Sequence, residues 1–165
     1  MTSQTGQASL FDSGDAQAVT ERYASDAKCG FCAVLRGEQQ VVLIHENDRL
    51  MSFLDHRPLF HGHVLLIPKI HVVLMRELPQ DRVQEFFMAA QRLERAVETA
   101  LEADGSMILI NNVVSQSVPH LHVHVIPRRK KDGLRFWLGP RRSYDSEHPA
   151  DLYAGKIRAA LASAG

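Results

Sequence analysis

Hydrophobic residues recur along this chain with two different spacings, and each spacing predicts a different kind of element. Over residues 79–103 the apolar side chains return every three or four positions with charged residues between them, which predicts one long amphipathic helix. Pro79 suits its first turn, and Gly105 follows its last residues as a stop signal. A second, short helix is predicted near residues 151–162.

The other apolar runs are short, rich in β-branched residues and bounded by turn-forming residues, so they predict strands. We expect a hairpin and three further strands, over residues 39–45, 50–54, 63–68, 106–111 and 121–126. Strands around one long helix indicate an α+β domain. Residues 1–20 have no hydrophobic periodicity and are expected to form a disordered tail, which leaves a single domain over residues 21–165.

Composition narrows the class of protein. The 165 residues, of which 45% are hydrophobic, are enough for one domain with a hydrophobic core. Nineteen Lys and Arg residues balance nineteen Asp and Glu residues, so no net charge would draw the protein to nucleic acid or to an anionic membrane. The chain has neither a signal-peptide pattern nor an apolar run of about 18 residues, the length that crosses a membrane. We therefore expect a cytoplasmic protein that binds neither nucleic acid nor membrane.

The strand predicted over residues 121–126 continues a strict alternation that begins at His120. In an extended chain, His120, His122 and His124 point to one face and the aliphatic residues between them to the other. Two kinds of chemistry fit three imidazoles on one face. Two of them could bind a catalytic zinc ion whose water is the nucleophile. Alternatively, one neutral imidazole could attack phosphorus directly, since its ordinary pKa lies near neutral pH.

A polar loop directly precedes this strand and contains Ser115, Gln116 and Ser117. Hydroxyl and amide groups at this position could stabilise the negative charge that develops on phosphate oxygens during such an attack. We therefore regard these three residues as candidate phosphate contacts.

Cys29 and Cys32 are the only cysteines of the chain and form a Cys-x-x-Cys pair. In a reducing compartment such a pair is a metal clamp or a redox couple before it is a structural disulfide. A redox pair of the thioredoxin kind would require a strand-to-helix junction and would leave the nine histidines unexplained. Metal binding is therefore favoured, with histidines supplying two further ligands.

Three segments together resemble the histidine-triad family. Residues 120–126 match its signature His-φ-His-φ-His-φ-φ, in which φ is apolar. The run from Asp55 to His71 resembles the family's upstream segment, and Cys29-Gly-Phe-Cys32 resembles its frequent opening. These segments cover a core of about residues 29–130 and leave residues 131–165 as an extension. The resemblance implies a five-stranded antiparallel sheet with one long helix and a short C-terminal helix.

The resemblance also implies roles for individual residues. His122 would be the nucleophile that forms a nucleotidyl-histidine intermediate, and His124 would contact the phosphate. Ser117 would lie beside the bridging or leaving oxygen. His63 matches the family's additional upstream histidine, and Asp55 would accept hydrogen bonds from the ribose hydroxyls.

Further implied contacts concern the nucleotide and the metal. Asn111 matches an amide that contacts the nucleotide, but the following loop is about two residues shorter than in the family, which leaves Asn112 as a competitor. In family branches that carry the cysteine pair, a structural zinc ion is completed by two histidines. The implied zinc ligands are Cys29, Cys32, His71 and His120. Many family members are homodimers that pair through the long helix and a sheet edge, so a homodimer is implied here as well.

Three functions remain open at this point. The first is a hydrolase of a purine nucleotide with a scissile phosphoanhydride or phosphoramidate bond, and the second is a transferase or phosphorylase that uses the same intermediate. The third is a zinc-stabilised nucleotide-binding module with little turnover. Phe31, Ile44 and Leu54 are candidates for a purine pocket or for core packing. The basic residues 128–130 and the apolar segment 133–140 are candidates for contacts with a leaving group or a partner.

Overall fold

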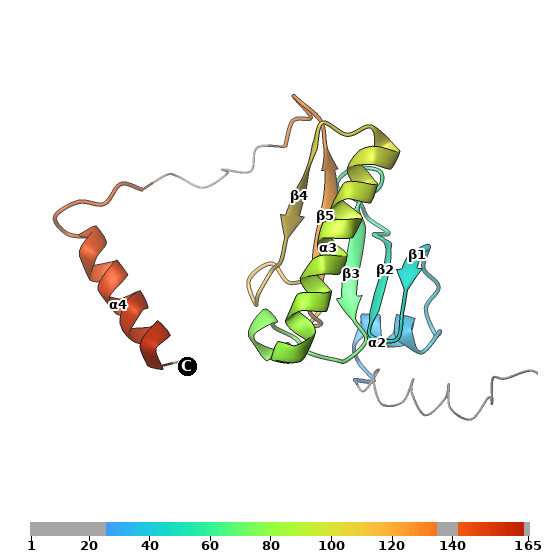
Figure 1. Cartoon of the computed structure of the whole chain (residues 1–165), viewed down its shortest axis with the longest axis horizontal. Helices are drawn as coiled ribbons and strands as arrows, with labels where there is room; N and C mark the ends of the chain where they lie inside the picture. The colour runs from blue at the N-terminus through green and yellow to red at the C-terminus, as the bar shows by residue number, and fades with distance from the viewer. Residues whose placement is uncertain (1–25, 135–141, 164–165) are drawn as a thin grey trace, which may run out of the picture. The chain divides into compact units, whose positions relative to one another are not determined.

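A computed structural model of the chain describes residues 26–134 and 142–163, so the tail expected over residues 1–20 and most of the segment 133–140 lie outside the described residues. The chain divides into two compact units after Lys130. The elements of the first unit are α2 (Gly30–Leu35), β1 (Leu43–Glu46), β2 (Leu50–Leu54), β3 (Val64–Pro68), the 3-10 turn η1 (Met75–Glu77), α3 (Gln80–Leu101), β4 (Gly105–Leu109) and β5 (Val123–Arg128) (Figure 1). The second unit contains α4 (Ala150–Ser163).

The five strands form one sheet in the order β1-β2-β3-β5-β4, and every neighbouring pair is antiparallel. The predicted α+β class with a five-stranded antiparallel sheet is therefore confirmed. Strand β5 lies inside the sheet, where His124 is opposite Leu65 of β3 and Leu109 of β4. The histidine-bearing segment is thus held between neighbours on both sides.

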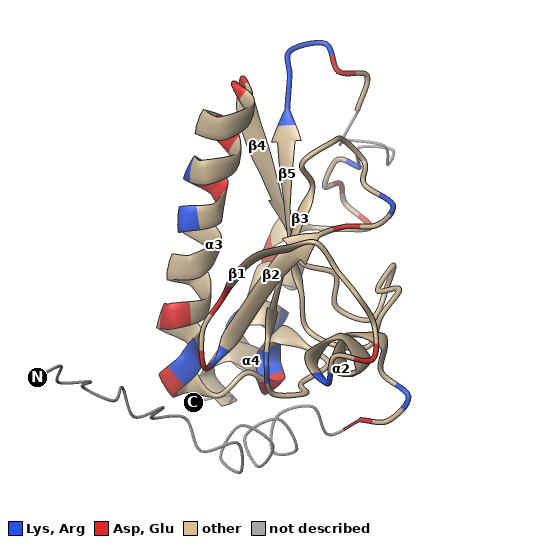
Figure 2. Cartoon of the chain, turned by 90° about the vertical axis from the view of Figure 1, so that its right-hand side faces the viewer, with Lys and Arg blue, Asp and Glu red and all other residues tan. Residues whose placement is uncertain are grey.

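Helix α3 covers one face of the sheet and forms the larger hydrophobic core. Leu121, Val123 and Val125, the aliphatic residues between and after the histidines, are fully buried against it together with Phe86. Figure 2 shows α3 and α2 on opposite sides of the sheet, with the charged residues of α3 on its outward side. The predicted alternation between a core face and a histidine face therefore exists in the fold.

The opposite face carries α2 and a second cluster of buried residues. These include both cysteines, Phe31, Phe53 and Leu65. Helix α2 was not predicted from the sequence, because six residues are too few for a helical periodicity to be visible. Its position matters because α2 begins directly after Cys29 and contains Cys32.

Several predicted boundaries were wrong by a few residues, and the hydrogen bonds explain why. The first strand begins at Leu43, because the backbone N–H of Gln39 donates to Ala33 instead of to a strand. The last strand begins at Val123, because the N–H of Leu121 donates to Val72, outside the sheet. Helix α3 ends at Leu101 and is capped by Glu102 in the left-handed conformation (φ 49°), so Gly105 is not its stop but the first residue of β4.

The turn before His63 requires a glycine. Gly62 has φ 91°, and a Cβ atom at this position would collide with the side chain of Leu101. The turn is closed by the N–H of His63, which donates to the carbonyl of Phe60 at 3.0 Å. This glycine therefore fixes where the buried imidazole of His63 enters the histidine face.

Candidate active site and metal site

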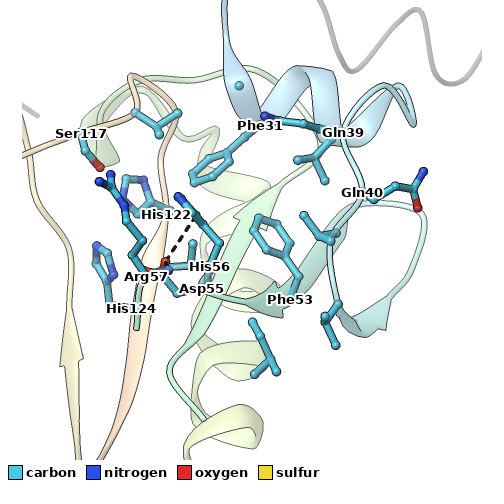
Figure 3. A pocket seen from close by; sticks show the side chains of 17 residues that line it. Phe31, Gln39, Gln40, Phe53, Asp55, His56, Arg57, Ser117, His122 and His124 are labelled. Atoms are coloured by element: carbon cyan, nitrogen blue, oxygen red, sulfur yellow. Dashed lines mark hydrogen bonds and ion pairs between the residues drawn. The ribbon is translucent and has the colours of Figure 1, made fainter. Parts of the chain in front are cut away.

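His122 is held in one tautomer by the backbone. Its Nδ1–H donates to the carbonyl oxygen of His120 at 2.6 Å, so the lone pair is on Nε2. Burial lowers the pKa of His122, which keeps the ring neutral and nucleophilic near neutral pH. Although the residue is only 2% exposed, it lines a cavity of about 980 Å³ and is accessible from it (Figure 3).

His63 and His124 form a directed pair beside it. The N–H of Leu59 donates to Nδ1 of His63 at 3.4 Å, and Nε2 of His63 lies 2.9 Å from Nδ1 of His124. With the Leu59 N–H on Nδ1 of His63, the proton of each ring is on Nε2, and that of His124 can be donated to a ligand; a proton on Nδ1 of His63, facing Asp55 at 3.5 Å, would reverse this order. Burial, with the neighbouring imidazoles, lowers the pKa of His124 to about 4, so this donor is neutral.

Asp55 lies at the end of β2, next to the histidines. Its Oδ2 atom lies 3.5 Å from Nδ1 of His63, and its Oδ1 atom accepts the N–H of Arg57 at 2.8 Å. The carboxylate also lines the cavity, so it presents an acceptor to a ligand there.

The cavity has an apolar wall and a polar end. The wall is formed by Phe31, Val34, Val41, Phe53, Leu54 and Leu65, and the polar end by Asp55, Arg57, Ser117, His122 and His124 (Figure 3). An aromatic wall suits a planar base, and the hydrogen-bonding end suits phosphate groups. Of the three candidates for a purine pocket, Phe31 and Leu54 line this cavity, whereas Ile44 lies at another cavity beside α3.

The loop before the histidines contributes less to the cavity than its sequence suggests. Ser117 lines it, but the side chain of Gln116 donates to the carbonyl of Val73 at 2.7 Å and accepts the N–H of Val113. Asn112 is similarly occupied, because its Oδ1 atom accepts the N–H of Met75 at 2.9 Å. Asn111 and Ser115 are not among the residues that line the cavity. These amides hold the loop in place rather than reach the cavity.

A second cluster lies behind the first, between α2, β3 and the loop that enters β5. One potential ligand atom from each of Cys29, Cys32, His71 and His120 lies within 4.8 Å of the others. Nδ1 of His120 lies 3.5 Å from Sγ of Cys29, and Nδ1 of His71 lies 3.3 Å from Sγ of Cys32. Two thiols and two imidazoles so arranged can bind zinc in a closed tetrahedral site.

The outer contacts of this cluster fit a metal site. Nε2 of His120 donates to the carbonyl of Pro68 at 2.8 Å, and Nε2 of His71 lies 3.6 Å from a carboxylate oxygen of Asp26. These contacts leave the Nδ1 lone pairs directed at the cysteines, which is how ligating histidines are usually oriented. Burial raises the pKa of the Cys32 thiol to about 11, and either role, redox partner or metal ligand, requires the thiolate form.

One cavity residue, Arg57, was not identified from the sequence, the place of Phe31 was left open, and one expected group is elsewhere. Phe31 was only one of several apolar candidates, yet its ring lies 5.2 Å from that of His122, edge to face. Arg57 carried no signal except its place two residues after Asp55. Two of the basic residues expected to meet a leaving group have other side-chain partners: Arg129 donates to the carbonyls of Leu101 and Glu102, and Arg128 lies over the ring of Phe60.

Comparison with known proteins gives a consistent result. The chain is 33% identical to the adenylylsulfatase of Arabidopsis thaliana over 81% of its own length and 68% of the relative. It is 34% identical to the adenosine 5′-monophosphoramidase of Saccharomyces cerevisiae over 66% of its length and 68% of the relative. A zinc-bound histidine-triad protein from Mycobacterium smegmatis has a similar structure, with a TM-score of 0.62 and 38% identity over 84% of this chain and 98% of that one.

In residues 26–134 and 142–163, no helix combines the length and the apolar composition of a membrane span.

The model of the HIT domain family matches residues 36–131, which include both histidine clusters except for the two cysteines. Named relatives of the chain are hydrolases, so the prediction of an enzyme of this kind is confirmed. The geometry, the family match and these relatives together show that the chain belongs to the HIT domain family.

Proposed function

We propose that the protein is a nucleotide phosphohydrolase that acts through a nucleotidyl-histidine intermediate on His122. The observation that carries this proposal is the hydrogen bond from Nδ1 of His122 to the carbonyl of His120, at 2.6 Å. It keeps the Nε2 lone pair available beside a cavity of nucleotide size. It also stabilises the positive charge that develops on the ring once Nε2 has bonded to phosphorus.

The reaction proceeds in two displacements at phosphorus. In the first, Nε2 of His122 bonds to the phosphorus while the bond to the leaving group breaks, and the leaving group takes the electron pair. His124 donates its Nε2–H to a phosphate oxygen, and the Ser117 hydroxyl donates a hydrogen bond to the leaving atom. In the second, water attacks the phosphorus, the P–N bond breaks with its electrons returning to Nε2, and a water proton is released to solvent.

The substrate class that we propose is a purine nucleotide, with adenosine 5′-monophosphate joined through phosphorus to a leaving group. The relatives named adenylylsulfatase and adenosine 5′-monophosphoramidase support this class. Asp55, next to the cavity wall, is our candidate for the ribose hydroxyls. Asn111, Ser115 and Gln116 remain proposed nucleotide contacts, and the two hydrogen bonds of the Gln116 amide to the backbone of Val73 and Val113 favour an indirect role through the loop.

The variant His122→Asn tests the proposal directly. We expect wild-type protein to cleave adenosine phosphoramidate or a diadenosine polyphosphate and to form an acid-labile P–N adduct with labelled substrate. The variant should bind nucleotide but lose turnover by at least about a thousandfold. His45→Asn, at an exposed histidine on β1, is the matched control and should retain wild-type turnover.

Other outcomes select the alternative functions. A wild-type protein that binds adenine nucleotides but never forms the adduct would be a binding module. Turnover that becomes faster in added phosphate and yields a nucleoside diphosphate would identify a phosphorylase.

We infer that Cys29, Cys32, His71 and His120 bind a structural zinc ion. The ion would supply a rigid link between α2 and the histidine segment, and no chemical step requires it. The outer contacts of the two histidines, which leave both Nδ1 atoms facing the cysteines, support a metal over a redox pair. Elemental analysis should find about one zinc per chain, and the variant Cys32→Ser should lower that stoichiometry.

We also propose a homodimer formed through α3 and the edge strand β4. Strand β4 is at the end of the sheet order, and Ile108 on it is 47% exposed. An unpaired edge with an apolar residue favours pairing with a second copy. Sedimentation should give a dimer for wild-type protein and a monomer for Ile108→Lys.

The two free cysteines suit the reducing cytoplasm that we expected from the sequence. We also propose that residues 131–165 are an extension of a core over residues 29–130.

A further inference from the structure

We propose that Arg57 binds an anionic leaving group and so favours substrates in which the nucleotide phosphate is joined to a second anion, such as a sulfate or a phosphate, over those with a neutral amine. This inference rests on the proposed function, since it concerns the leaving group of the same reaction.

The backbone fixes the base of this side chain next to the reacting groups. The N–H of Arg57 donates to Oδ1 of Asp55 at 2.8 Å, and Pro58 follows it, so the turn after β2 has little freedom. In Figure 3 the side chain of Arg57 extends from this turn toward Ser117, alongside the rings of His122 and His124. All four residues line the same cavity. The guanidinium is thus on the side of the phosphorus that Ser117 is proposed to face, where the leaving group departs.

The charges around the cavity make Arg57 the natural partner of a second anion. Among the described residues that line the cavity, it is the only lysine or arginine. His63 and His124 cannot replace it, because burial lowers the pKa of both and keeps them neutral. The carboxylate of Asp55 lines the same cavity and would repel a second anion, so a cation is needed there. His56 also lines the cavity, but its Nδ1 atom lies 3.7 Å from Oδ1 of Asp55, so Arg57 is the permanent cation that a second anion meets there.

The two kinds of leaving group differ in the charge that they carry when the bond to phosphorus breaks. When the bond to phosphorus breaks, a departing sulfate or phosphate carries the electron pair as additional negative charge, which a guanidinium can stabilise through paired hydrogen bonds. A departing amine instead requires a proton on nitrogen and gains nothing from a neighbouring cation. Arg57 should therefore stabilise the transition state of the first class and leave that of the second nearly unaffected.

The variants Arg57→Gln and Arg57→Lys test this with two substrates of the same nucleotide. One is adenosine 5′-phosphosulfate, with an anionic leaving group, and the other is adenosine 5′-phosphoramidate, with a neutral one. We expect Arg57→Gln to lower the ratio of their kcat/KM values by about tenfold or more, the effect of losing a charge-assisted contact. Arg57→Lys should recover part of the ratio, because it keeps the charge but loses the paired geometry.

The control is Arg95→Gln, which removes the same charge from the exposed side of α3, on the other face of the sheet. It should leave both kcat/KM values within about twofold of wild type, since a screened, distant charge contributes little. A ratio in Arg57→Gln within about twofold of wild type would show that Arg57 is only a solvated side chain, and an equal loss on both substrates would show a general role in binding. Either result overturns the proposal. If wild-type protein cleaves neither substrate, the proposed hydrolase function fails first, and the two failures are distinguishable.

Discussion

The two faces of the sheet are built on the same strands but are stabilised in different ways. On the α3 face, the side chains of Leu121, Val123 and Val125 are fully buried in apolar contacts with the helix. On the opposite face, His120 and His122 are just as deeply buried, at 0% and 2% exposure, yet each is a polar group that requires partners. One face therefore depends on packing, and the other on hydrogen bonds and, as we propose, on a metal ion.

This difference predicts how each face responds to damage. In a hydrophobic core, the loss of stability grows with the volume of the side-chain atoms removed. A polar cluster instead loses its arrangement when one hydrogen-bonding partner is removed. Variants on the α3 face should therefore reduce global stability, and variants on the histidine face should change local order and chemistry.

The largest effect on stability is expected for Phe86→Ala. Phe86 is fully buried under α3, and removing its ring should lower the free energy of unfolding by about 4 kcal/mol, from lost burial and the cavity left behind. Denaturant unfolding should show the loss, while kcat of the folded fraction stays near that of wild type. A fall in kcat without a fall in stability would contradict the separation of the two faces.

Cys32→Ser should have a smaller and more local effect. If a metal holds α2, its loss should loosen this six-residue helix, which also packs on the small cluster around Phe31 and Phe53. Amide hydrogen exchange in α2 should accelerate by about a hundredfold, while the amides of α3 keep their protection. Chelation of wild-type protein should reproduce this pattern, and uniform acceleration in both helices would show that the faces are not independent.

A change of pH should affect only the histidine face. The pKa of His124 is about 4 in the folded protein, compared with 6.5 for an ordinary histidine, so the folded state binds fewer protons than the unfolded state in this interval. The free energy of unfolding should therefore be constant between pH 6.5 and about 8, below the range in which the Cys32 thiol titrates, and fall as the pH decreases from 6.5 toward 4. The variant His124→Asn should show a shallower decrease in the same titration, and an unchanged slope would assign the effect to other groups.

The smallest effect is expected in the loop between β4 and β5. Val113 has φ 68° and Ser115 has φ 62°, and a β-branched residue is strained in this region. Val113→Gly should relieve the strain and stabilise the protein by about 0.5 kcal/mol, because the gain is partly offset by the greater freedom of glycine in the unfolded chain. A thermal shift measured beside Val114→Gly, the exposed neighbour with no positive φ, would isolate the contribution of the backbone.

Much of the fold follows from local periodicity. The alternation around His122 was sufficient to predict both a core face and a histidine face, and the spacing of apolar residues predicted α3 to within two residues at each end. The proximity of Cys29, Cys32, His71 and His120 also agrees with the resemblance, because the fold brings one potential ligand atom of each within 4.8 Å of the others. The short helix α2 was missed, since six residues carry no period.

The sequence by itself determined which residues alternate, where the long helix lies and which side chains carry the chemistry, because these depend on neighbours a few positions away. The tertiary structure alone decided that Phe31 would lie against His122, that Arg57 would extend toward Ser117, and that the amide of Gln116 would hold its loop rather than face the cavity. The members of each pair are more than 40 residues apart along the chain: Phe31 and His122, Arg57 and Ser117, and Val73 and Gln116. Contacts over such separations depend on how the strands and loops pack, and spacing along the sequence carries no record of them.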